Sequence, residues 1–430
     1  MNETTRIKRI FRNVIQRGTG RAHLLIRDYP KVNFSHEILK AAVNNYAYDP
    51  QCEGSRGPYI VELINMCTQK EILTQRVLQK LLEQKENTWG LDQLFDIARI
   101  LAQAGNMEAR TIFYKRLALG SLPEYACAGI YEAVELDGIE GMKRAAEVIG
   151  QVLATDYNET EDDSLIKYTQ DENPGVRVED ELHKAAQTNE YIARYLVAVN
   201  KSRHQESEQP PGTALGFQFI QQIIAQKLKQ RLFKSVTNRL TRKQVRELAD
   251  ACMLETDRAR QSIYMQVFRY VKFPYGYELL LTLAQQPPRP NDRLVEDAVM
   301  ALQFFKAPAI REFALVALNS SKTPSLYVDL LINHYRQGDH TLLHQLAEQA
   351  KTELEIENLA SSYCLIYRKH KTKQCLKPLN KIYHRMNCGI HRGQVVEIML
   401  RRGVLPNKIR DEVLFDSYTS VRELLNPKQA

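Results

Sequence analysis

Residues 69–84 read QKEILTQRVLQKLLEQ, a run in which apolar residues recur at helical spacing. Two later stretches follow it at a constant step: GNMEARTIFYKRLA (105–118) and GIEGMKRAAEVIGQVL (138–153). Their arginines, Arg76, Arg110 and Arg144, show this 34-residue step directly. A fixed step of this length is typical of repeat proteins, in which each repeat is one helix–turn–helix unit.

The segments that precede these three helices keep the same step. Ile60, Leu94 and Ala128 are spaced in the same way, each inside a helix-like stretch. Strand signals are almost absent, because the chain has neither Asn-Gly hairpin turns nor sustained alternating runs. A lone helix pair cannot bury its apolar face, whereas stacked pairs share a core. The sequence therefore predicts an all-α fold, an α-solenoid of stacked antiparallel helix pairs.

Three polar breaks divide this pattern. Residues 155–175 carry seven acids and one lysine and predict an exposed acidic loop. Residues 201–213 contain Pro-Pro-Gly and predict a linker, and residues 285–292 (QQPPRPND) form a third break. The expected organisation is N-terminal repeats (1–154), an acidic loop and helix (155–200), a linker (201–213) and C-terminal repeats (214–430).

The C-terminal repeats carry a family resemblance. Residues 306–337 have a proline-led turn at Pro308, an Ile-Arg pair at 310–311 and small residues at Ala314 and Ala317, followed by a second apolar helix. Residues 387–425 echo parts of this, with Asp416 and Val421-Arg422. Both segments resemble a HEAT repeat. The 34-residue period of the N-terminal third would also suit a tetratricopeptide unit, but the tetratricopeptide pattern of Trp, Leu-Gly and Tyr is missing. The resemblance implies an interaction scaffold.

The totals set broad limits. The chain has 430 residues, a net charge of +8 and seven cysteines, and 44% of its residues are hydrophobic. No apolar run is long enough to span a bilayer, so no membrane partner is expected. The odd cysteine count favours a reduced, cytoplasmic compartment. The basic N-terminal stripe around Ile7 and Phe11 resembles a targeting helix, but Glu3 and the lack of serine favour a first solenoid helix.

Two tracts concentrate positive charge. Residues 225–246 hold eight Lys or Arg and no acid, and residues 368–410 hold twelve with one acid, Glu397. Lys227, Arg231 and Lys234 are expected on one helix face. A basic surface of this kind can follow a phosphate backbone, and interleaved tyrosines can stack on bases. The alternatives are a solvated face or a contact with residues 155–173. The candidate residues for an anionic partner are Lys227, Arg231, Lys234, Arg242, Arg246, Lys369, Lys371, Lys373 and Arg392, with Tyr363, Tyr367 and Tyr383 as stacking candidates.

Sites for catalysis and for a metal are weaker. Cys375, His384, Cys388 and His391 have half of a zinc-site spacing, because Cys375 has no close partner, so neither a metal nor a cofactor is expected. Some HEAT-like proteins are DNA glycosylases with several tryptophans in their cleft. Here Trp89 is the only tryptophan, and it is expected in the core or at a helix cap. The glycines of QRGTGRAH (16–23) most simply end a helix.

The sequence thus predicts a non-enzymatic binding scaffold with a concave, partly basic surface. Another protein is the expected partner, and a nucleic-acid-binding module is the first alternative. A HEAT-like DNA glycosylase is the second alternative.

Overall fold

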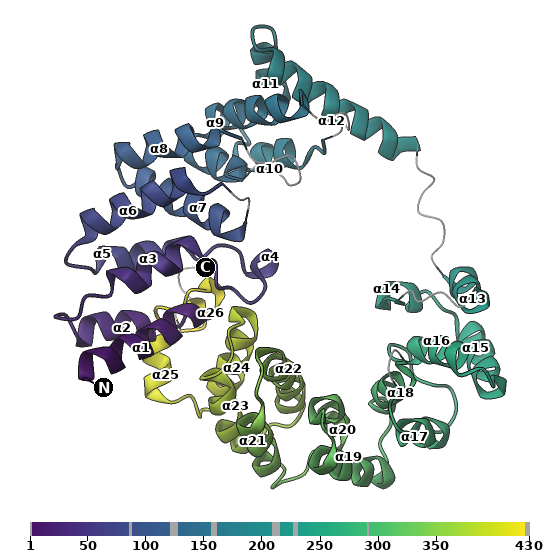
Figure 1. Cartoon of the computed structure of the whole chain (residues 1–430). Coiled ribbons are helices and arrows are strands. Elements are labelled where there is room, and N and C mark those ends of the chain that lie inside the picture. The colour runs from purple at the N-terminus through teal and green to yellow at the C-terminus, as the bar shows by residue number, and fades with distance from the viewer. Residues whose placement is uncertain are drawn as a thin grey trace. The chain divides into compact units, whose positions relative to one another are not determined.

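The computed structural model describes seven stretches of the chain: residues 2–85, 88–120, 128–155, 161–208, 216–226, 231–289 and 292–425. Within these stretches the protein is all-α, with helices numbered α1 to α26 and two 3-10 helices, and no strand is present (Figure 1). The all-α prediction is confirmed. None of the described helices combines the length and apolar character that a bilayer span requires.

The chain forms two compact units. Unit 1 contains residues 1–209, 387–393 and 406–430, so it holds both ends of the chain. Unit 2 contains residues 210–386 and 394–405.

Within its described residues, the first part of unit 1 contains twelve helices. Their bounds are α1 Glu3–Arg17, α2 Arg21–Asp28, α3 Ser35–Val43, α4 Pro50–Glu53, α5 Gly57–Asn65, α6 Lys70–Glu83, α7 Trp89–Gln103, α8 Met107–Leu117, α9 Ile130–Leu153, α10 Ser164–Glu172, α11 Val178–Ala186 and α12 Glu190–Glu208. The helices α1, α3, α5, α7 and α9 contact one another in that order, and α6 contacts α8 beside them. One apolar cluster runs through this part of the unit, from Ile7 to Val199. Shared burial between successive helices stabilises the stack, because no single pair buries its own apolar face.

The helices predicted from the 34-residue step are present. The pairs α5–α6 and α7–α8 match the first two repeats. In the third, α9 kinks at Gly138, whose φ of 56° and ψ of −125° are not helical. Two predicted helices therefore follow each other without a loop. Glycine suits this position because a side chain disfavours the positive φ.

Polar contacts join consecutive repeats in unit 1. The Arg110 guanidinium and the Tyr114 hydroxyl both donate hydrogen bonds to the Asp137 carboxylate. Arg144 in turn lies over the Tyr114 ring, 4.3 Å from the ring centroid, at a distance suited to a cation–π contact. Two of the three arginines that reveal the repeat in the sequence thus connect neighbouring helix pairs.

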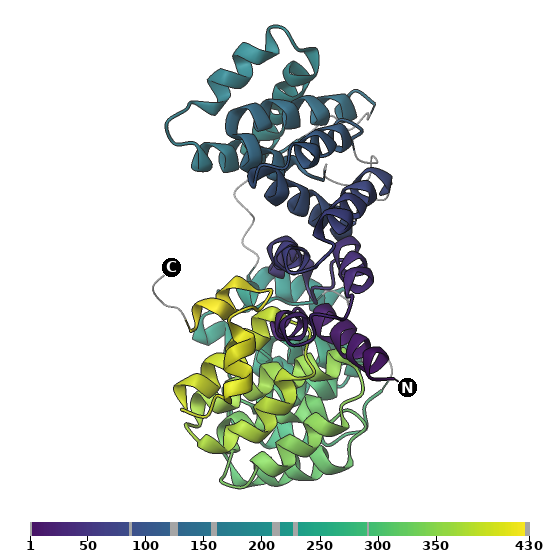
Figure 2. The ribbon, with the colours of Figure 1, turned by 90° about the vertical axis from the view of Figure 1, so that its left-hand side faces the viewer.

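The C-terminal segment of unit 1 packs on the N-terminal helices. It comprises the first residues of α24 (Gly389–Arg401), α25 (Asn407–Val413) and α26 (Thr419–Glu423), and the yellow C-terminal helices lie beside the purple N-terminal ones in Figures 1 and 2. The backbone N–H of Ser417 donates to the Gly18 carbonyl at 2.8 Å. A Cβ on Gly20 would lie 1.9 Å from the Glu412 carbonyl oxygen, so only glycine permits this close approach.

Two ionic clusters hold this segment in place. Arg422 donates to both carboxylate oxygens of Glu62, at 2.6 and 3.0 Å, and His23 Nε2 lies 2.9 Å from Glu62 Oε2. Deeper in the unit, Arg392 is fully buried and forms a bidentate pair with Asp416 at 2.6 and 2.7 Å. Planar, two-point pairs of this kind fix geometry as well as charge.

Unit 2 contains the remaining elements. Their bounds are α13 Phe217–Ala225, α14 Lys234–Thr237, α15 Arg242–Leu254, α16 Arg258–Phe268, α17 Glu278–Ala284, α18 Leu294–Leu302, α19 Pro308–Ser320, η1 Pro324–Leu330, α20 Leu331–His334, α21 His340–Gln349, α22 Glu353–Lys369, η2 Lys373–Cys375 and α23 Leu376–Tyr383, followed by the later residues of α24. Neighbouring elements in this order pack together, as α15 on α16, α17 on α18 and α22 on α23. Arginine–carboxylate pairs again span helix pairs, since Arg311 forms a bidentate pair with Asp339 at 2.8 Å.

Three features of the predicted organisation need correction. The expected linker at 201–213 is helical as far as Glu208, where α12 ends, and residues 209–213 lie outside the described stretches. The expected acidic loop contains α10, which buries Leu165, Ile166 and Thr169 on one face. An apolar stripe at helical spacing outweighs the acidic composition there. The expected second helix of the HEAT-like unit is mainly the 3-10 helix η1, followed by the four-residue α20.

Candidate binding sites

The first basic tract does not form the helix expected to carry Lys227, Arg231 and Lys234 on one face. Helix α13 ends at Ala225 and α14 begins at Lys234, so Arg231 lies between helices and shares no helix face with Lys234. Lys227 lies outside the described residues. The backbone N–H of Leu232 donates to Gln266 Oε1 at 3.1 Å, which ties the intervening segment to α16. The shared helix face predicted for this tract is therefore wrong.

The charge of this tract is nevertheless exposed. Arg231, Lys234, Arg242 and Arg246 are all exposed and form no ion pair within the described part of the chain. Arg242 and Arg246 are four residues apart on α15 and therefore lie on one helix face. Residues 231–246 are called the basic segment below.

An aromatic residue within the basic segment escaped the sequence analysis. Phe233 is 62% exposed and lies between Arg231 and Lys234 in the chain. Large exposed aromatic side chains flanked by arginine are typical of interfaces, where aromatics and arginine are enriched. The sequence shows this aromatic residue between Arg231 and Lys234, but its neighbour Leu232 is buried, so composition alone does not tell which of the two apolar side chains is exposed.

The second basic tract is different, because much of its charge is used inside the fold. Arg392 is buried against Asp416 and cannot contact a partner, which corrects its assignment as a binding residue. Lys369 donates a hydrogen bond to Asn333. Lys371 and Lys373 are exposed, and so is Lys369, whose partner is a neutral amide, so these three lysines keep their positive charge at the surface.

The three tyrosines of the second tract are also inside the fold. Tyr363, Tyr367 and Tyr383 are fully buried, and the Tyr363 hydroxyl donates to the Leu343 carbonyl. Burial raises the pKa of the Tyr363 hydroxyl well above its ordinary value. Their predicted role in base stacking is wrong, because helical spacing places them on the inner faces of α22 and α23.

The cysteine and histidine group is divided between the units. Cys375 and His384 belong to unit 2, whereas Cys388 and His391 belong to unit 1. Within unit 2 the Cys375 thiol is buried, which raises its pKa to about 11, while His384 is exposed. Neither half of the group is a zinc site by itself, since tetrahedral zinc needs four ligands.

The tryptophan and its neighbouring acids do not form a walled cleft. Trp89 is expected either in the core or at a helix cap. It begins α7 and is 51% exposed, so it lies at the helix start and not in the core. Asp96 forms an ion pair with Arg99 at 2.6 Å. Burial raises the pKa of Asp92 to about 6 and that of Glu132 to about 8, and the neighbouring carboxylates add to the shift of Glu132. These acids share one region, but the described residues place no second tryptophan wall beside them, because Trp89 is the only tryptophan of the chain.

A groove in unit 2 lies among α17, α18, α19 and η1 and has a volume of about 810 Å³. Its lining is mostly apolar and includes Pro287, Phe313 and Tyr327. Its two acids are already paired, Asp292 with Arg258 and Glu296 with Arg293. Carboxylates held in this way are poor candidates for a general acid or base.

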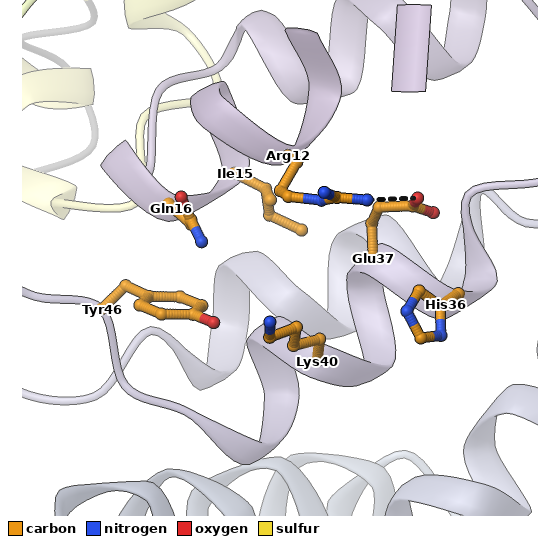
Figure 3. A pocket seen from close by; sticks show the side chains of 7 residues that line it. All are labelled: Arg12, Ile15, Gln16, His36, Glu37, Lys40 and Tyr46. Carbon is orange, nitrogen blue, oxygen red and sulfur yellow. Dashed lines mark ion pairs between the residues drawn. The ribbon is translucent and has the colours of Figure 1, made fainter. Parts of the chain in front are cut away.

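A small pocket, lined mainly by polar residue types, lies between α1 and α3 in unit 1 (Figure 3). Its volume is about 140 Å³, and it is lined by Arg12, Ile15, Gln16, His36, Glu37, Lys40 and Tyr46. The C-terminus of α1 is fixed by Gly18, whose φ of 69° gives a left-handed cap. The N-terminus of α3 is fixed by Asn33, whose side chain accepts from the Ser35 N–H at 2.9 Å. Both helices that frame the pocket therefore have defined ends.

Glu37 is the unusual residue of this pocket. It is 5% exposed, its Oε1 lies 3.8 Å from Arg12 Nη2, and its Oε2 is buried without a hydrogen-bond partner. The side chains of Gln16, His36, Lys40 and Tyr46 make no hydrogen bond or ion pair within the described part of the protein. The pocket thus combines a buried acceptor with several unused polar groups, which the sequence could not show because α1 and α3 are separate in the chain.

Comparisons with known proteins assign no family. No protein-family model matches the chain, and no curated protein is significantly similar to it in sequence.

Proposed function

We propose that the protein is a non-enzymatic helical binding scaffold whose basic segment binds an acidic protein partner. The observation that carries the proposal is the exposed Phe233 between the exposed cations Arg231 and Lys234. An apolar anchor with surrounding positive charge suits a partner that offers carboxylates around an apolar contact. The scaffold part of the proposal is supported by residues 306–337 and 387–425, whose resemblance to HEAT repeats implies an interaction scaffold.

The described cysteines support a reducing, cytoplasmic compartment as part of this proposal. Cys52, Cys67, Cys252, Cys364 and Cys375 are all free thiols. Burial raises the pKa of Cys252 and Cys364 to about 12, so these thiols stay protonated and unreactive at neutral pH. Persistent disulfides are rare in such a compartment.

A single-stranded nucleic acid is the second candidate partner, and Phe233 is the observation that favours it. An exposed aromatic ring beside arginine can stack on a base while the cations contact phosphates. The loss of Tyr363, Tyr367 and Tyr383 as stacking residues leaves Phe233 as the exposed aromatic residue of the two tracts within the described part of the chain.

A photo-crosslinking experiment separates these candidates. Phe233 is replaced by p-benzoylphenylalanine, and the control position is Leu354, which is 60% exposed in the same unit but lies between Glu353 and Glu355. Irradiation in native lysate should give a protein adduct at position 233 that nuclease leaves intact. The same adduct should be absent at position 354 and in a variant that also carries Arg242→Gln and Arg246→Gln.

The other outcomes are equally decisive. An adduct that nuclease removes would support the nucleic-acid candidate instead. Equal adducts at both positions, or none at position 233, would overturn the basic segment as the binding site.

A further inference from the structure

We infer that the α1–α3 pocket binds a small molecule in which an ammonium group stands beside an anionic group. This class contains amino acids and phosphorylated amino alcohols, which share that chemistry. The inference is independent of the partner proposed for the basic segment, because the pocket lies in unit 1 and the segment lies in unit 2.

On its acidic side, formed by Glu37, the pocket offers a hydrogen-bond acceptor to a ligand. The Glu37 Oε2 atom is buried without a hydrogen-bond partner, and its Oε1 contacts Arg12 only at 3.8 Å. A buried carboxylate without a hydrogen bond is costly to the fold, so a ligand that donates to Oε1, which makes only the 3.8 Å contact with Arg12, gains correspondingly. An ammonium group is the strongest such donor, because its charge also compensates the carboxylate.

On its basic side, formed by Lys40 and Arg12, the pocket offers positive charge to an anionic group. Lys40 has no partner within the described residues, and Arg12 is only loosely engaged with Glu37. Figure 3 shows Lys40 and Tyr46 pointing toward each other below Gln16, opposite the Arg12–Glu37 pair. A carboxylate or phosphate placed there can accept from Lys40, with Gln16 and Tyr46 as further donors.

The size of the pocket limits the ligand. A volume of about 140 Å³ is below the range of drug-sized sites, about 300–1,000 Å³. The buried Ile15 gives the pocket an apolar wall. The ligand is therefore of amino-acid size, with its two charged groups a few ångströms apart and little additional bulk.

The test uses isothermal titration calorimetry on the full chain with five probes. L-Glutamate and phosphoethanolamine carry both groups, whereas acetate, inorganic phosphate and ethylammonium carry one. At least one of the two-group probes should bind at least about tenfold more tightly than each of its one-group counterparts, as expected for a lost charge-assisted hydrogen bond. The probe that binds more tightly distinguishes a carboxylate ligand from a phosphate ligand.

Variants of the pocket test which residue binds the ammonium group and which binds the anionic group. Glu37→Gln is nearly isosteric and should weaken the two-group probe about tenfold or more, whereas inorganic phosphate, which the carboxylate repels, should bind no more weakly. Lys40→Gln should weaken both. Lys31→Gln, an exposed lysine outside the lining, is the matched control and should change neither.

Three results would overturn the inference. The first is that no probe binds at about 10 mM, the weak end of small-ligand affinity. The second is that one-group and two-group probes bind equally, which would reduce the pocket to a simple ion site. The third is that Glu37→Gln and Lys31→Gln have the same effect. Circular dichroism of each variant confirms that the helices are retained.

Discussion

The two basic tracts look alike in the sequence and differ in the structure. Residues 225–246 and 368–410 are both rich in Lys and Arg and almost free of acids. In the basic segment, the cations are exposed and form no ion pairs within the described residues, apart from Lys243 near Glu247 at 4.0 Å. In the second tract, Arg392 pairs with Asp416, which follows α25, and Lys381 pairs with Glu348 of α21.

The difference teaches where ion-pair partners come from in this all-helical fold. Packing of neighbouring helices brings residues that are distant in the sequence into contact, so an acid-free stretch can still be neutralised by acids of an adjacent helix. Backbone carbonyls serve as well, since Arg385 donates to the carbonyls of Ala347, Glu348 and Ala350 at the end of α21. Local charge composition therefore indicates a binding surface only where no neighbouring repeat supplies acceptors.

The largest effect is expected at the buried pair of the second tract. Arg392→Met leaves Asp416 buried without its cation and should lower the free energy of unfolding by about 3–5 kcal/mol. Arg242→Met in the basic segment is the matched control and should change it by less than about 0.5 kcal/mol. Urea denaturation followed by circular dichroism measures both. Equal effects of the two substitutions would remove the contrast between the tracts.

A smaller effect is expected where arginine contacts backbone instead of carboxylate. Arg385→Met removes donors from the last carbonyls of α21 and should cost about 1–2 kcal/mol. Hydrogen exchange should show the loss, with faster exchange in α21 and α23 and little change in α15. Unchanged exchange in α21 would contradict this prediction, because it would show that water replaces the Arg385 guanidinium at these carbonyls without loss of stability.

The carboxylate of Glu62 makes the long-range pairing of unit 1 depend on pH. Burial acts to raise the pKa of this carboxyl, but hydrogen bonds from His23 and Arg422 outweigh it and lower the pKa to about 2. A depressed folded pKa adds stability that is full above about 4.3, the ordinary value, and is lost as pH falls toward about 2. Solvent screens the partly exposed carboxylate, so Glu62→Gln should destabilise by only about 1–2 kcal/mol at pH 7 and by clearly less at pH 3.

Denaturation midpoints of the wild type and Glu62→Gln at pH 7, 5 and 3 measure this dependence. Glu71→Gln is the control, because Glu71 is exposed and its ion pair with Lys70 is long, at 3.9 Å, and lies on the surface. Its effect should be small at every pH. A constant difference between Glu62→Gln and wild type across the range would show that the ionised carboxylate adds nothing.

Much of the fold could be predicted from the sequence, because helical periodicity is a local property. The 34-residue step located α5 to α9 well enough to be recognised, and QRGTGRAH correctly indicated a helix end at Gly18. The sites could be predicted far less well. Whether Arg392 is buried or Arg242 exposed depends on which residues of other repeats face them, and the α1–α3 pocket depends on Glu37 lying opposite Arg12. Such facts are set by packing, which spacing within one helix does not specify.

The last prediction concerns the salt dependence of binding to a polyanion, where the substitutions should change stability least and should separate the two tracts most directly. A single-stranded oligothymidylate is the probe, because its phosphates are regularly spaced and its binding constant falls as salt rises, with a log–log slope of about −0.7 for each phosphate contacted. Arg231→Gln with Lys234→Gln should weaken binding and flatten this slope by about 1–2 units, since both side chains are exposed and have no ion-pair partner within the described residues. Lys381→Gln with Arg385→Gln removes the same charge from the second tract and should leave the slope unchanged, because those side chains are used by Glu348 and by the end of α21. Fluorescence anisotropy at several salt concentrations measures both slopes. The contrary result is that the substitutions at Lys381 and Arg385 flatten the slope as much as those at Arg231 and Lys234. Cations that are bound within the fold would then still contact a polyanion. The two tracts would not differ in binding, even where they differ in stability.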